Sequence, residues 1–204
     1  MTFDLTLSEG TYLVRLARRA IEVSFSRAKM DFDALSKTRE VCGVFVTLNI
    51  LRGGEKQLRG CIGYPYPIKP LAEAVNEVAK AAAFEDPRFP QLTKKELSEI
   101  VIEVSVLTPP EVIKVEKPEQ YPTCIRVGEH GLIVKRGGRS GLLLPQVATE
   151  WGWDSEELLS QCCVKAGLPP DSWRLSGTQI SSFKAIIFAE KTPGGEVVRE
   201  EIQG

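Results

Sequence analysis

The stretch Gln57-Leu58-Arg59-Gly60-Cys61-Ile62-Gly63-Tyr64 decides how the surrounding chain folds. The run before it, 41–51, is rich in Val, Ile, Thr and Phe and predicts a strand. Arg52-Gly53-Gly54-Glu55 then predicts a turn, because paired glycines accept positive φ angles without steric cost. The chain is therefore expected to return as a second strand over 56–63, which makes a hairpin.

Side chains of a strand alternate between its two faces, so the second strand has two different sides. The predicted sides are Leu58, Gly60 and Ile62 on one face, and Arg59, Cys61 and Gly63 on the other. The apolar side chains of the first face require a core. The glycines beside the thiol leave the backbone bare, which suits close approach of a ligand or of another backbone segment.

Length and composition are those of an ordinary soluble globular protein. The 204 residues suffice for a sizeable core, in one domain or in two small lobes. Hydrophobic residues make up 43% of the chain, and no apolar run approaches the roughly 18 residues of a membrane span. The net charge of −1 gives no overall field toward polyanions. We expect no membrane attachment; nucleic acid stays open as a partner but is not favoured by the charge.

The cysteine pattern bears on compartment and metal content. Five cysteines occur without any Cys-x-x-Cys spacing, and there is one histidine, so the sequence offers no recognisable zinc ligand set. The N-terminus lacks the basic and apolar regions of a secretory signal. We therefore expect a reduced, cytoplasmic protein without a structural metal. The sequence leaves the identity of any cofactor open.

The order of predicted elements indicates the fold class. Helices are predicted over 8–29, 69–83, 145–151 and 154–167, with Ser8 as the first cap and a further short helix capped by Thr93 and Glu96. Strands are predicted over 100–107, 111–115, 123–127, 132–135, 142–144 and 182–189. Because strands cluster in hairpins with helices between the clusters, we predict an α+β fold with mainly antiparallel or mixed sheets flanked by helices.

Two groups of arginines have competing interpretations. Arg15, Arg18, Arg19 and Arg27 lie largely off the apolar stripe of the first helix, which favours a solvated face over a patch for an acidic partner. The segment 136–141 has three glycines and two arginines, as a phosphate loop does, but not in the required order. A hairpin tip is therefore preferred for this segment.

The segment 58–63 resembles a motif of a known protein family. Leu58-Arg59-Gly60-Cys61-Ile62-Gly63 is similar to the signature hexapeptide of the AMMECR family, named for a chromosomal region deleted in an Alport-related contiguous-gene syndrome. Other stretches resemble family motifs in the same order and spacing: Asp86-Pro87-Arg88-Phe89-Pro90, Ser105-Val106-Leu107-Thr108, His130-Gly131-Leu132, Leu144-Pro145-Gln146-Val147-Ala148 and Cys163-Val164-Lys165-Ala166-Gly167-Leu168-Pro169. The match extends over roughly residues 8 to 190.

The resemblance implies a single AMMECR-type domain over 1–204 with two lobes. The larger lobe would come from both terminal parts and the smaller one from the middle, with the signature near the cleft. In some bacterial relatives the domain is joined to, or encoded with, a Memo-like dioxygenase-fold protein and a radical S-adenosylmethionine enzyme. This association implies a role in a modification pathway with such partners, and it names neither a reaction nor a substrate.

One hypothesis for the signature is a cysteine-dependent enzyme with Cys61 as nucleophile. A thiol attacks as the thiolate, and Arg59 on the same predicted face is a cation that would lower the thiol pKa. His130 would be the general base if the fold brings it close. The alternatives are a Cys61 that only fills a gap between glycines and a His130 that only bonds within its own turn.

A second hypothesis is a ligand or substrate site, which needs no general base and is therefore preferred. Arg59 and Arg88 would form a fork for a carboxylate or phosphate, the bare backbone at Gly60 and Gly63 would supply amide donors, and Asp86 would help to orient the ligand. The partner would be a small molecule or a protein. The alternative for Asp86 and Arg88 is a local ion pair. In a third, structural hypothesis, the glycines and Cys61 serve packing or protein interaction alone.

Overall fold

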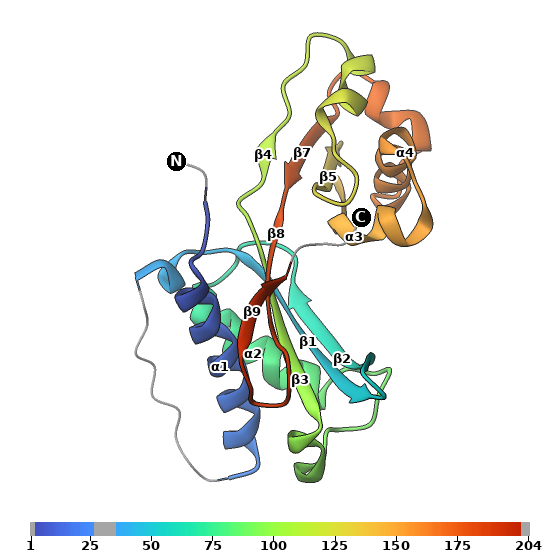
Figure 1. Ribbon diagram of the computed structural model, residues 1–204. Coiled ribbons are helices and arrows are strands. Elements are labelled where there is room, and N and C mark those ends of the chain that lie inside the picture. Colours follow the sequence, from blue (N-terminus) through green and yellow to red (C-terminus); the bar gives the residue numbers. More distant parts are fainter. Residues whose placement is uncertain (1–2, 27–35, 201–204) are drawn as a thin grey trace. The chain divides into compact units, whose positions relative to one another are not determined.

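The computed structural model of the chain describes residues 3–26 and 36–200. It confirms an α+β fold, in which helices accompany two antiparallel sheets (Figure 1). The described residues divide into two compact units, unit 1 with 3–26, 36–107 and 186–200, and unit 2 with 108–185. The chain thus leaves unit 1 after Leu107 and returns to it at Ile186.

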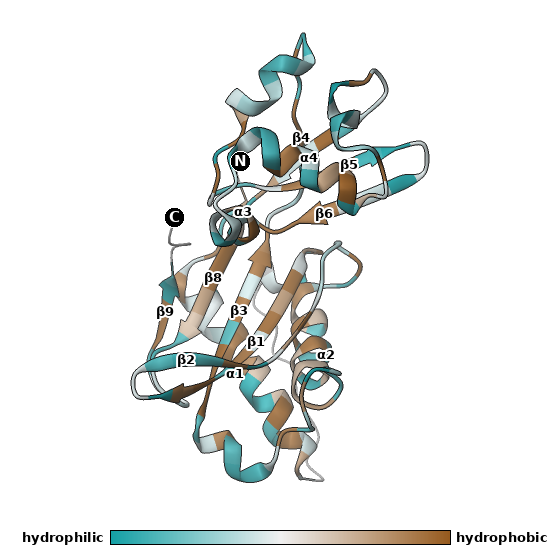
Figure 2. Cartoon of the chain, turned by 90° about the vertical axis from the view of Figure 1, so that its right-hand side faces the viewer, coloured by the Kyte–Doolittle hydropathy of each residue, from teal (hydrophilic) through white to brown (hydrophobic). Residues whose placement is uncertain are grey.

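Unit 1 is a five-stranded sheet with two helices against one face. Its elements are α1 (Leu7–Ser24), η1 (Ser36–Arg39), β1 (Gly43–Arg52), β2 (Glu55–Tyr64), α2 (Leu71–Phe84), η2 (Lys94–Ser98), β3 (Ile100–Leu107), β8 (Ala185–Glu190) and β9 (Val197–Glu200). The strands are ordered β2-β1-β3-β8-β9, so β2 and β9 form the two edges. The core lies between the helices and the side chains of alternate strand positions such as Val44, Val46 and Leu48. Figure 2 shows hydrophobic residues concentrated along β1, β3 and α2.

The first helix begins and ends earlier than predicted. Its N-cap is Thr6, not Ser8, because the Thr6 hydroxyl accepts the Glu9 N–H while the Glu9 carboxylate accepts the Thr6 N–H in a capping box. The last helical residue is Ser24 rather than a residue near 29. The predicted extension over 27–29, the connection over 30–35 and Arg27 lie outside the described residues. The apolar stripe of α1, including Leu13 and Leu16, is buried as expected.

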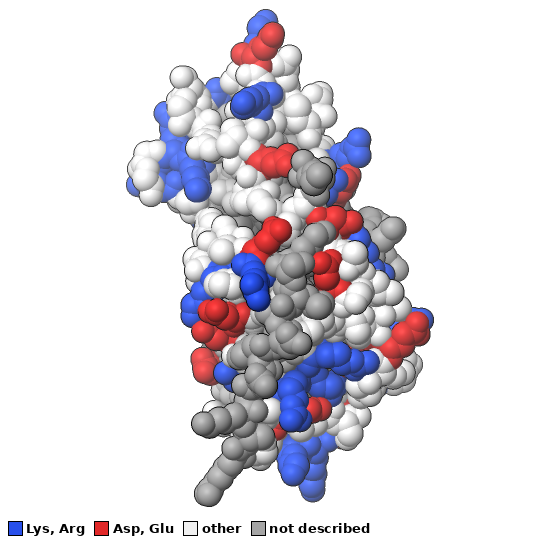
Figure 3. Space-filling view, turned by 90° about the vertical axis from the view of Figure 1, so that its left-hand side faces the viewer, with Lys and Arg blue, Asp and Glu red and all other residues white. Residues whose placement is uncertain are grey.

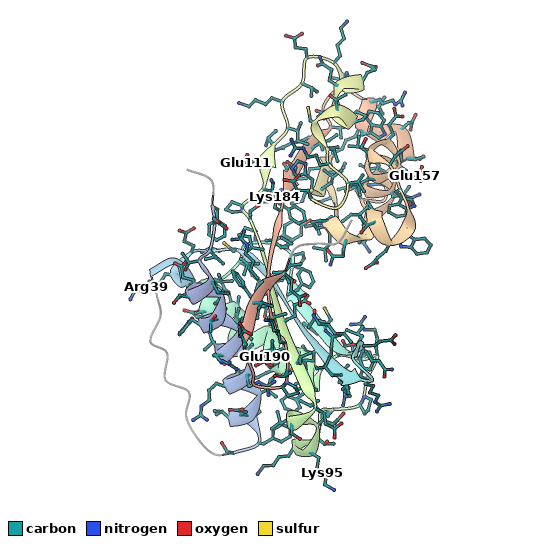
Figure 4. All side chains as sticks on the ribbon, viewed as in Figure 1. Arg39, Lys95, Glu111, Glu157, Lys184 and Glu190 are labelled. Carbon is teal, nitrogen blue, oxygen red and sulfur yellow. The ribbon has the colours of Figure 1, made fainter. Side chains whose placement is uncertain are left out.

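The arginines of α1 do not all lie on a solvated face. Arg19 is largely exposed, and Figure 3 shows basic and acidic side chains interspersed over the described part of one face of the molecule. Arg18 is buried, with its Nε donating to Glu190 Oε1 at 2.8 Å and a terminal nitrogen donating to Ile100 O at 2.8 Å. Glu190 lies at the end of β8 beside α1 (Figure 4) and is completely buried. The prediction of a solvated Arg18 was wrong, because its partner comes from the far end of the chain.

The β1–β2 hairpin is confirmed, but it contains a β-bulge that the alternation argument missed. Leu48 pairs with Gly60 and Asn49 pairs with Leu58, which leaves Arg59 as an extra residue of β2. Gly60 therefore lies opposite core-facing Leu48, whereas Leu58 lies opposite Asn49 on the other face and is 44% exposed. The prediction that Leu58 shares a face with Gly60 and Ile62 was wrong, because the bulge reverses the alternation at Arg59.

Unit 2 is a four-stranded sheet with short helices. Its elements are β4 (Glu111–Val112), η3 (Pro118–Cys124), β5 (Gly131–Arg136), β6 (Arg139–Leu143), α3 (Pro145–Trp151), α4 (Ser155–Lys165), η4 (Pro170–Arg174) and β7 (Gln179–Phe183). The order is β4-β7-β5-β6, and Leu132, Leu158, Leu159 and Trp173 belong to its own core. The tip between β5 and β6 is a two-glycine hairpin turn at Gly137 and Gly138, which agrees with the preferred interpretation of 136–141.

Two strand predictions were wrong, and one strand was not predicted. The segment predicted as a strand over 123–127 contains the end of η3 and an irregular stretch with a turn, and β5 pairs with β6 and β7. The predicted final strand over 182–189 is two strands, β7 and β8, that belong to different sheets. The charged segment after 195, for which no strand was predicted, contains β9, which pairs with β8 at the edge of the unit 1 sheet. Among the described helices, none combines the length and the apolar character that a membrane crossing requires.

Candidate functional site

Three polar side chains form one row on the face of the unit 1 sheet that α1 and α2 do not cover. Thr47 on β1 lies opposite Cys61 on β2 and, on its other side, opposite Glu103 on β3. Directly paired residues of antiparallel strands present their side chains on the same face. The Thr47 hydroxyl donates to the Cys61 sulfur at 3.2 Å. The row therefore places a hydroxyl between a thiol and a carboxyl group.

The sequence alternation contained a signal for this row. In 100–107, Glu103 and Ser105 interrupt an otherwise apolar strand at alternate positions, which predicts one polar face. Thr47 does the same in the first strand of the hairpin. What the sequence could not supply was the register that aligns Thr47 with both Cys61 and Glu103.

The backbone of Cys61 is held by Asp86 and Arg88 at the edge of the sheet. The Asp86 carboxylate accepts the Cys61 N–H at 2.8 Å, and the Arg88 guanidinium donates to the Cys61 carbonyl at 3.1 Å. Arg88 also donates to both oxygens of Asp86, at 3.0 and 2.7 Å. These two side chains supply the donor and acceptor that a neighbouring strand would otherwise provide. The predicted local pairing of Asp86 and Arg88 is present, and it fixes the cysteine.

Charge is distributed unevenly over this clamp. Asp86 is buried, whereas 53% of the Arg88 side chain is exposed. The hydrogen bonds from Arg88, followed by the Cys61 N–H, hold the pKa of Asp86 well below its usual range despite burial. Asp86 is therefore a fixed anion, and Arg88 presents the exposed positive group of the site.

The Cys61 thiol is not activated in this arrangement. Burial raises its pKa above the ordinary value, and the Thr47 hydrogen bond and the Arg88 charge oppose that rise only in part. Arg59 does not contribute to this balance. The prediction that Arg59 is the cation beside the thiol was therefore wrong, and Arg88 takes that position.

The Arg59 side chain forms its hydrogen bonds with Glu96 and Gln91 and not with Cys61. It is only 8% exposed, its Nε donates to Glu96 Oε1 at 2.7 Å, and a terminal nitrogen donates to the Gln91 carbonyl at 3.3 Å. The bond from Arg59 is the main cause that lowers the pKa of Glu96 to about 2. The bulge at Arg59 accounts for its separation from the face of Cys61, and its guanidinium fastens β2 to η2.

The two signature glycines permit close packing. A Cβ on Gly60 would lie 2.2 Å from the Ala82 carbonyl oxygen of α2, and a Cβ on Gly63 would lie 2.4 Å from the Phe45 ring. Both distances are far below any real Cβ contact, so neither position accepts a side chain without movement. Gly60 lets α2 approach the sheet, and Gly63 lets Phe45 lie across β2 next to Cys61.

Glu103 is partly buried, although neither α1 nor α2 covers its face of the sheet. Burial, followed by the charge of Glu200, raises its pKa, while Lys56 and a hydrogen bond from Ser105 at 3.2 Å oppose the rise. Lys56 on β2 and Glu200 on β9 form an ion pair of 2.7 Å. β2 and β9 are the opposite edges of the sheet, so an ion pair between them requires the sheet to curve toward its uncovered face. Figure 2 shows β2 crossing toward β9.

His130 belongs to unit 2 and is held within its own turn. Its Nδ1 accepts the Arg126 N–H at 3.2 Å, and burial lowers its pKa. This contact is the local role that the sequence offered as the alternative to a general base. Among the described residues, no group of three or more His, Cys, Asp and Glu side chains is placed to hold a metal ion.

Comparison with known proteins agrees with this fold and sequence. The family model AMMECR1 matches residues 14–188. A protein of Thermofilum pendens is 50% identical over 98% of both chains, and Protein MJ0810 of Methanocaldococcus jannaschii is 49% identical over 97% of this chain and 98% of its own. The crystal structure of uncharacterized protein PH0010 from Pyrococcus horikoshii is similar with a TM-score of 0.81 and 48% identity, covering 98% of this chain and all of that one. The chain therefore belongs to the AMMECR1 family.

Proposed function

We propose that unit 1 binds a small-molecule ligand or substrate on the uncovered face of its sheet, around Cys61. The observation that carries this proposal is the row of Cys61, Thr47 and Glu103, which puts three different polar groups on the face without helices. The clamp of Asp86 and Arg88 holds the cysteine end of the row rigid. A rigid, partly desolvated set of polar groups binds a ligand at a low ordering cost.

The charges of the site indicate what the ligand carries. Arg88 presents an exposed guanidinium beside Cys61, which suits a carboxylate or phosphate. Glu103 lies two strands away in the same row, roughly 10 Å along the sheet at about 4.8 Å per strand. A ligand that spans the row therefore offers an anionic group to Arg88 and a hydrogen-bond donor to Glu103. Nucleotides and amino-acid derivatives have both groups.

The signature residues divide into two roles in this proposal. Arg59, Gly60 and Gly63 set the position of β2, through an ion pair and two close contacts. Cys61 presents its side chain to the uncovered face, while Asp86 and Arg88 bind its backbone at the edge of the sheet. The structural hypothesis therefore applies to part of the signature, while the ligand site depends on the thiol and its row.

Differential labelling of cysteines tests the proposal. Iodoacetamide is applied to the native protein with and without each member of a panel of nucleotides, amino-acid derivatives and simple anions, and mass spectrometry reports each cysteine. We expect a ligand that slows labelling of Cys61 and leaves Cys124, an exposed cysteine of unit 2, unchanged. Glu103→Gln and Arg88→Ala should weaken that protection, whereas Glu99→Gln, at an exposed position outside the row, should keep it.

The binding proposal fails if the whole panel leaves Cys61 labelling unchanged and calorimetry with the same compounds is silent. Conversely, stoichiometric adduct formation between Cys61 and a substrate, lost in Cys61→Ser, would favour the cysteine-dependent enzyme. In that case Glu103 is the candidate proton acceptor, acting through Thr47 or the substrate because it lies beyond direct reach of the thiol. This second function rests on the same row.

On the basis of the family resemblance, we further propose that the site acts in a modification pathway with Memo-like and radical S-adenosylmethionine partners. Association of these proteins in bacterial relatives supports this part of the proposal. A binding measurement between this chain and a purified Memo-like protein tests it. Lack of association would exclude the Memo-like protein as a partner. The ligand-site proposal would not be affected, because cysteine labelling tests it separately.

A further inference from the structure

Phe45 is an aromatic side chain on the uncovered face of the unit 1 sheet, in the row next to that of Thr47. The two residues are separated by one position on β1, so their side chains share a face, and their rows are about 7 Å apart at about 3.4 Å per residue. In the neighbouring strands, Phe45 pairs with Gly63 on β2 and with Ser105 on β3. Small residues therefore flank the ring on both sides.

Core packing does not account for this ring. Phe45 is partly exposed, and within the described part of the chain it belongs to neither hydrophobic core and forms no aromatic pair. By contrast, Phe25 at the end of α1 packs against the unit 1 core, and its ring centroid lies 5.4 Å from that of Phe84. The fold therefore uses only part of the apolar surface that Phe45 offers.

Gly63 allows the Phe45 ring to lie against the sheet. A Cβ on Gly63 would lie 2.4 Å from both Cγ and Cδ1 of Phe45, so the ring occupies the space of the missing side chain. The ring is thereby supported on one side by the backbone of β2. A supported aromatic ring stacks on a planar ligand group with little loss of side-chain freedom.

Glu103 is a diagonal neighbour of Phe45, because Phe45 is paired with Ser105 two positions further along β3. Diagonal neighbours in a sheet are about 7–8 Å apart, within reach of aromatic and long side chains. The Ser105 hydroxyl donates to Glu103 Oε1 at 3.2 Å, whereas Oε2 accepts no hydrogen bond from the residues that the structure describes. Beside the ring there is thus an acceptor without a donor.

We propose that the ligand of this site is a nucleotide whose base stacks on Phe45. An N–H group at the edge of the base then donates to Glu103 Oε2, and a phosphate binds the exposed guanidinium of Arg88. The inference rests on the proposed function, since it names the ligand class for the same face. Phe45 becomes the residue that determines specificity for a planar ring.

The order of these groups across the sheet favours a nucleotide over an amino-acid derivative. Arg88 lies at the β2 edge, Phe45 on the middle strand β1 and Glu103 on β3, so an anion, a ring and a donor are required in that order. A nucleoside monophosphate carries its phosphate, its sugar and the N–H edge of its base in the same order. The carboxylate and ammonium groups of an amino acid share one carbon atom, so they cannot bind Arg88 and Glu103 together.

The probes are the monophosphates of adenosine, guanosine, cytidine and uridine, together with ribose 5-phosphate, which keeps the anion and the sugar but lacks the ring. Calorimetry on the full chain measures affinity, and protection of Cys61 from iodoacetamide is recorded in parallel. We expect at least one nucleotide to bind about five- to 150-fold more tightly than ribose 5-phosphate, as the loss of one base–aromatic stack predicts. This comparison uses the wild-type protein alone.

Variants then assign the preference to the ring. Phe45→Leu keeps an apolar side chain and should remove most of the difference between the nucleotide and ribose 5-phosphate, whereas Phe45→Tyr should keep it. Phe25→Leu is the matched control, because it removes an aromatic ring that packs against the core, and it should leave the preference unchanged. Circular dichroism melts check that each variant is folded.

Two results separate this inference from the proposed function. Equal affinity for the nucleotides and ribose 5-phosphate, or a full preference in Phe45→Leu, would overturn the nucleotide inference, while protection of Cys61 by ribose 5-phosphate would still support an anion site. Absence of binding by all five compounds would also overturn the nucleotide inference. The proposed function would then be decided by the amino-acid derivatives and simple anions of its own panel.

Discussion

The Thr47 hydroxyl donates a hydrogen bond to the Cys61 sulfur across two paired strands, at 3.2 Å. Such a bond stabilises the thiolate, and it acts against the burial that raises the thiol pKa. Removing the hydroxyl should therefore move the pKa of Cys61 further upward. In Thr47→Val, which keeps the shape, the pH profile of Cys61 alkylation should shift to higher pH. The profile of Thr47→Ser should stay close to that of wild type. Identical profiles for all three proteins would show that the Thr47 hydroxyl does not influence the Cys61 thiol.

The five cysteines should label in a fixed order. Cys124 is exposed and should react with iodoacetamide first, and Cys61 should follow more slowly because its raised pKa leaves little thiolate at neutral pH. Burial raises the pKa of Cys42 to about 11 and that of Cys162 to about 12, so these should react only after unfolding, as should buried Cys163. Labelling of Cys61 ahead of Cys124 at neutral pH would contradict the unactivated thiol.

Removal of the Glu190 charge should destabilise unit 1 strongly. Glu190→Gln leaves buried Arg18 without its carboxylate partner, and breaking a buried pair in this way costs about 3–5 kcal/mol. Glu200→Gln is the matched control, since it removes a surface partner of Lys56 and should cost at most about 1 kcal/mol. Urea unfolding measures both. A small loss for Glu190→Gln would mean that Arg18 finds other acceptors, such as the carbonyl groups it already contacts.

Gly60 should not accept even one methyl group. In Gly60→Ala the new carbon would meet a backbone oxygen of α2, which cannot rotate away as a side chain does, so the cost should reach about 3 kcal/mol. Leu58→Ala, two residues earlier on the exposed face, should cost less than about 1 kcal/mol. Thermal unfolding of the two variants compares the faces of β2. Similar losses would argue against the bulge.

The pair of Arg59 and Glu96 should give stability a defined acid dependence. The pKa of Glu96 is about 2 in the folded protein, below the ordinary value near 4.5, so its contribution is fully present above about pH 4.5. That contribution is lost as the pH falls toward 2. Glu96→Gln should therefore be less stable than wild type at pH 6, and the gap between them should close on acidification. A gap that stays constant from pH 6 to pH 2 would exclude this linkage.

The sequence predicted the structural features that depend on residues close to each other along the chain. The turn at Gly53 and Gly54, the capping box of Thr93 and Glu96 and the contact of Asp86 with Arg88 are all set by spacings of two or three residues. Each of these features appears in the structure. The α+β class followed in the same way from the order of the elements.

The features that the sequence did not predict depend on partners far along the chain. The bulge at Arg59 is defined by the register of β1, and the burial of Arg18 requires Glu190, which is 172 residues away. Thr47 and Glu103 joined the candidate site only when β1 was placed between β2 and β3. Alternation marks a polar face, but it cannot say which polar residues of different strands meet.

The division of unit 1 between both ends of the chain sets an order for synthesis. Residues 108–185 are contiguous, so unit 2 is complete in sequence while unit 1 still lacks β8 and β9. During translation, domains generally fold as units from the N-terminal side. Here the growing chain must instead hold an unfinished sheet, with β3 as a bare edge and Arg18 lacking its counter-charge, until the residues of β8 and β9 leave the ribosome. Most of unit 1 is synthesised before unit 2, but unit 1 is therefore the second of the two to reach its native state. It is also the unit that depends on protection of the nascent chain.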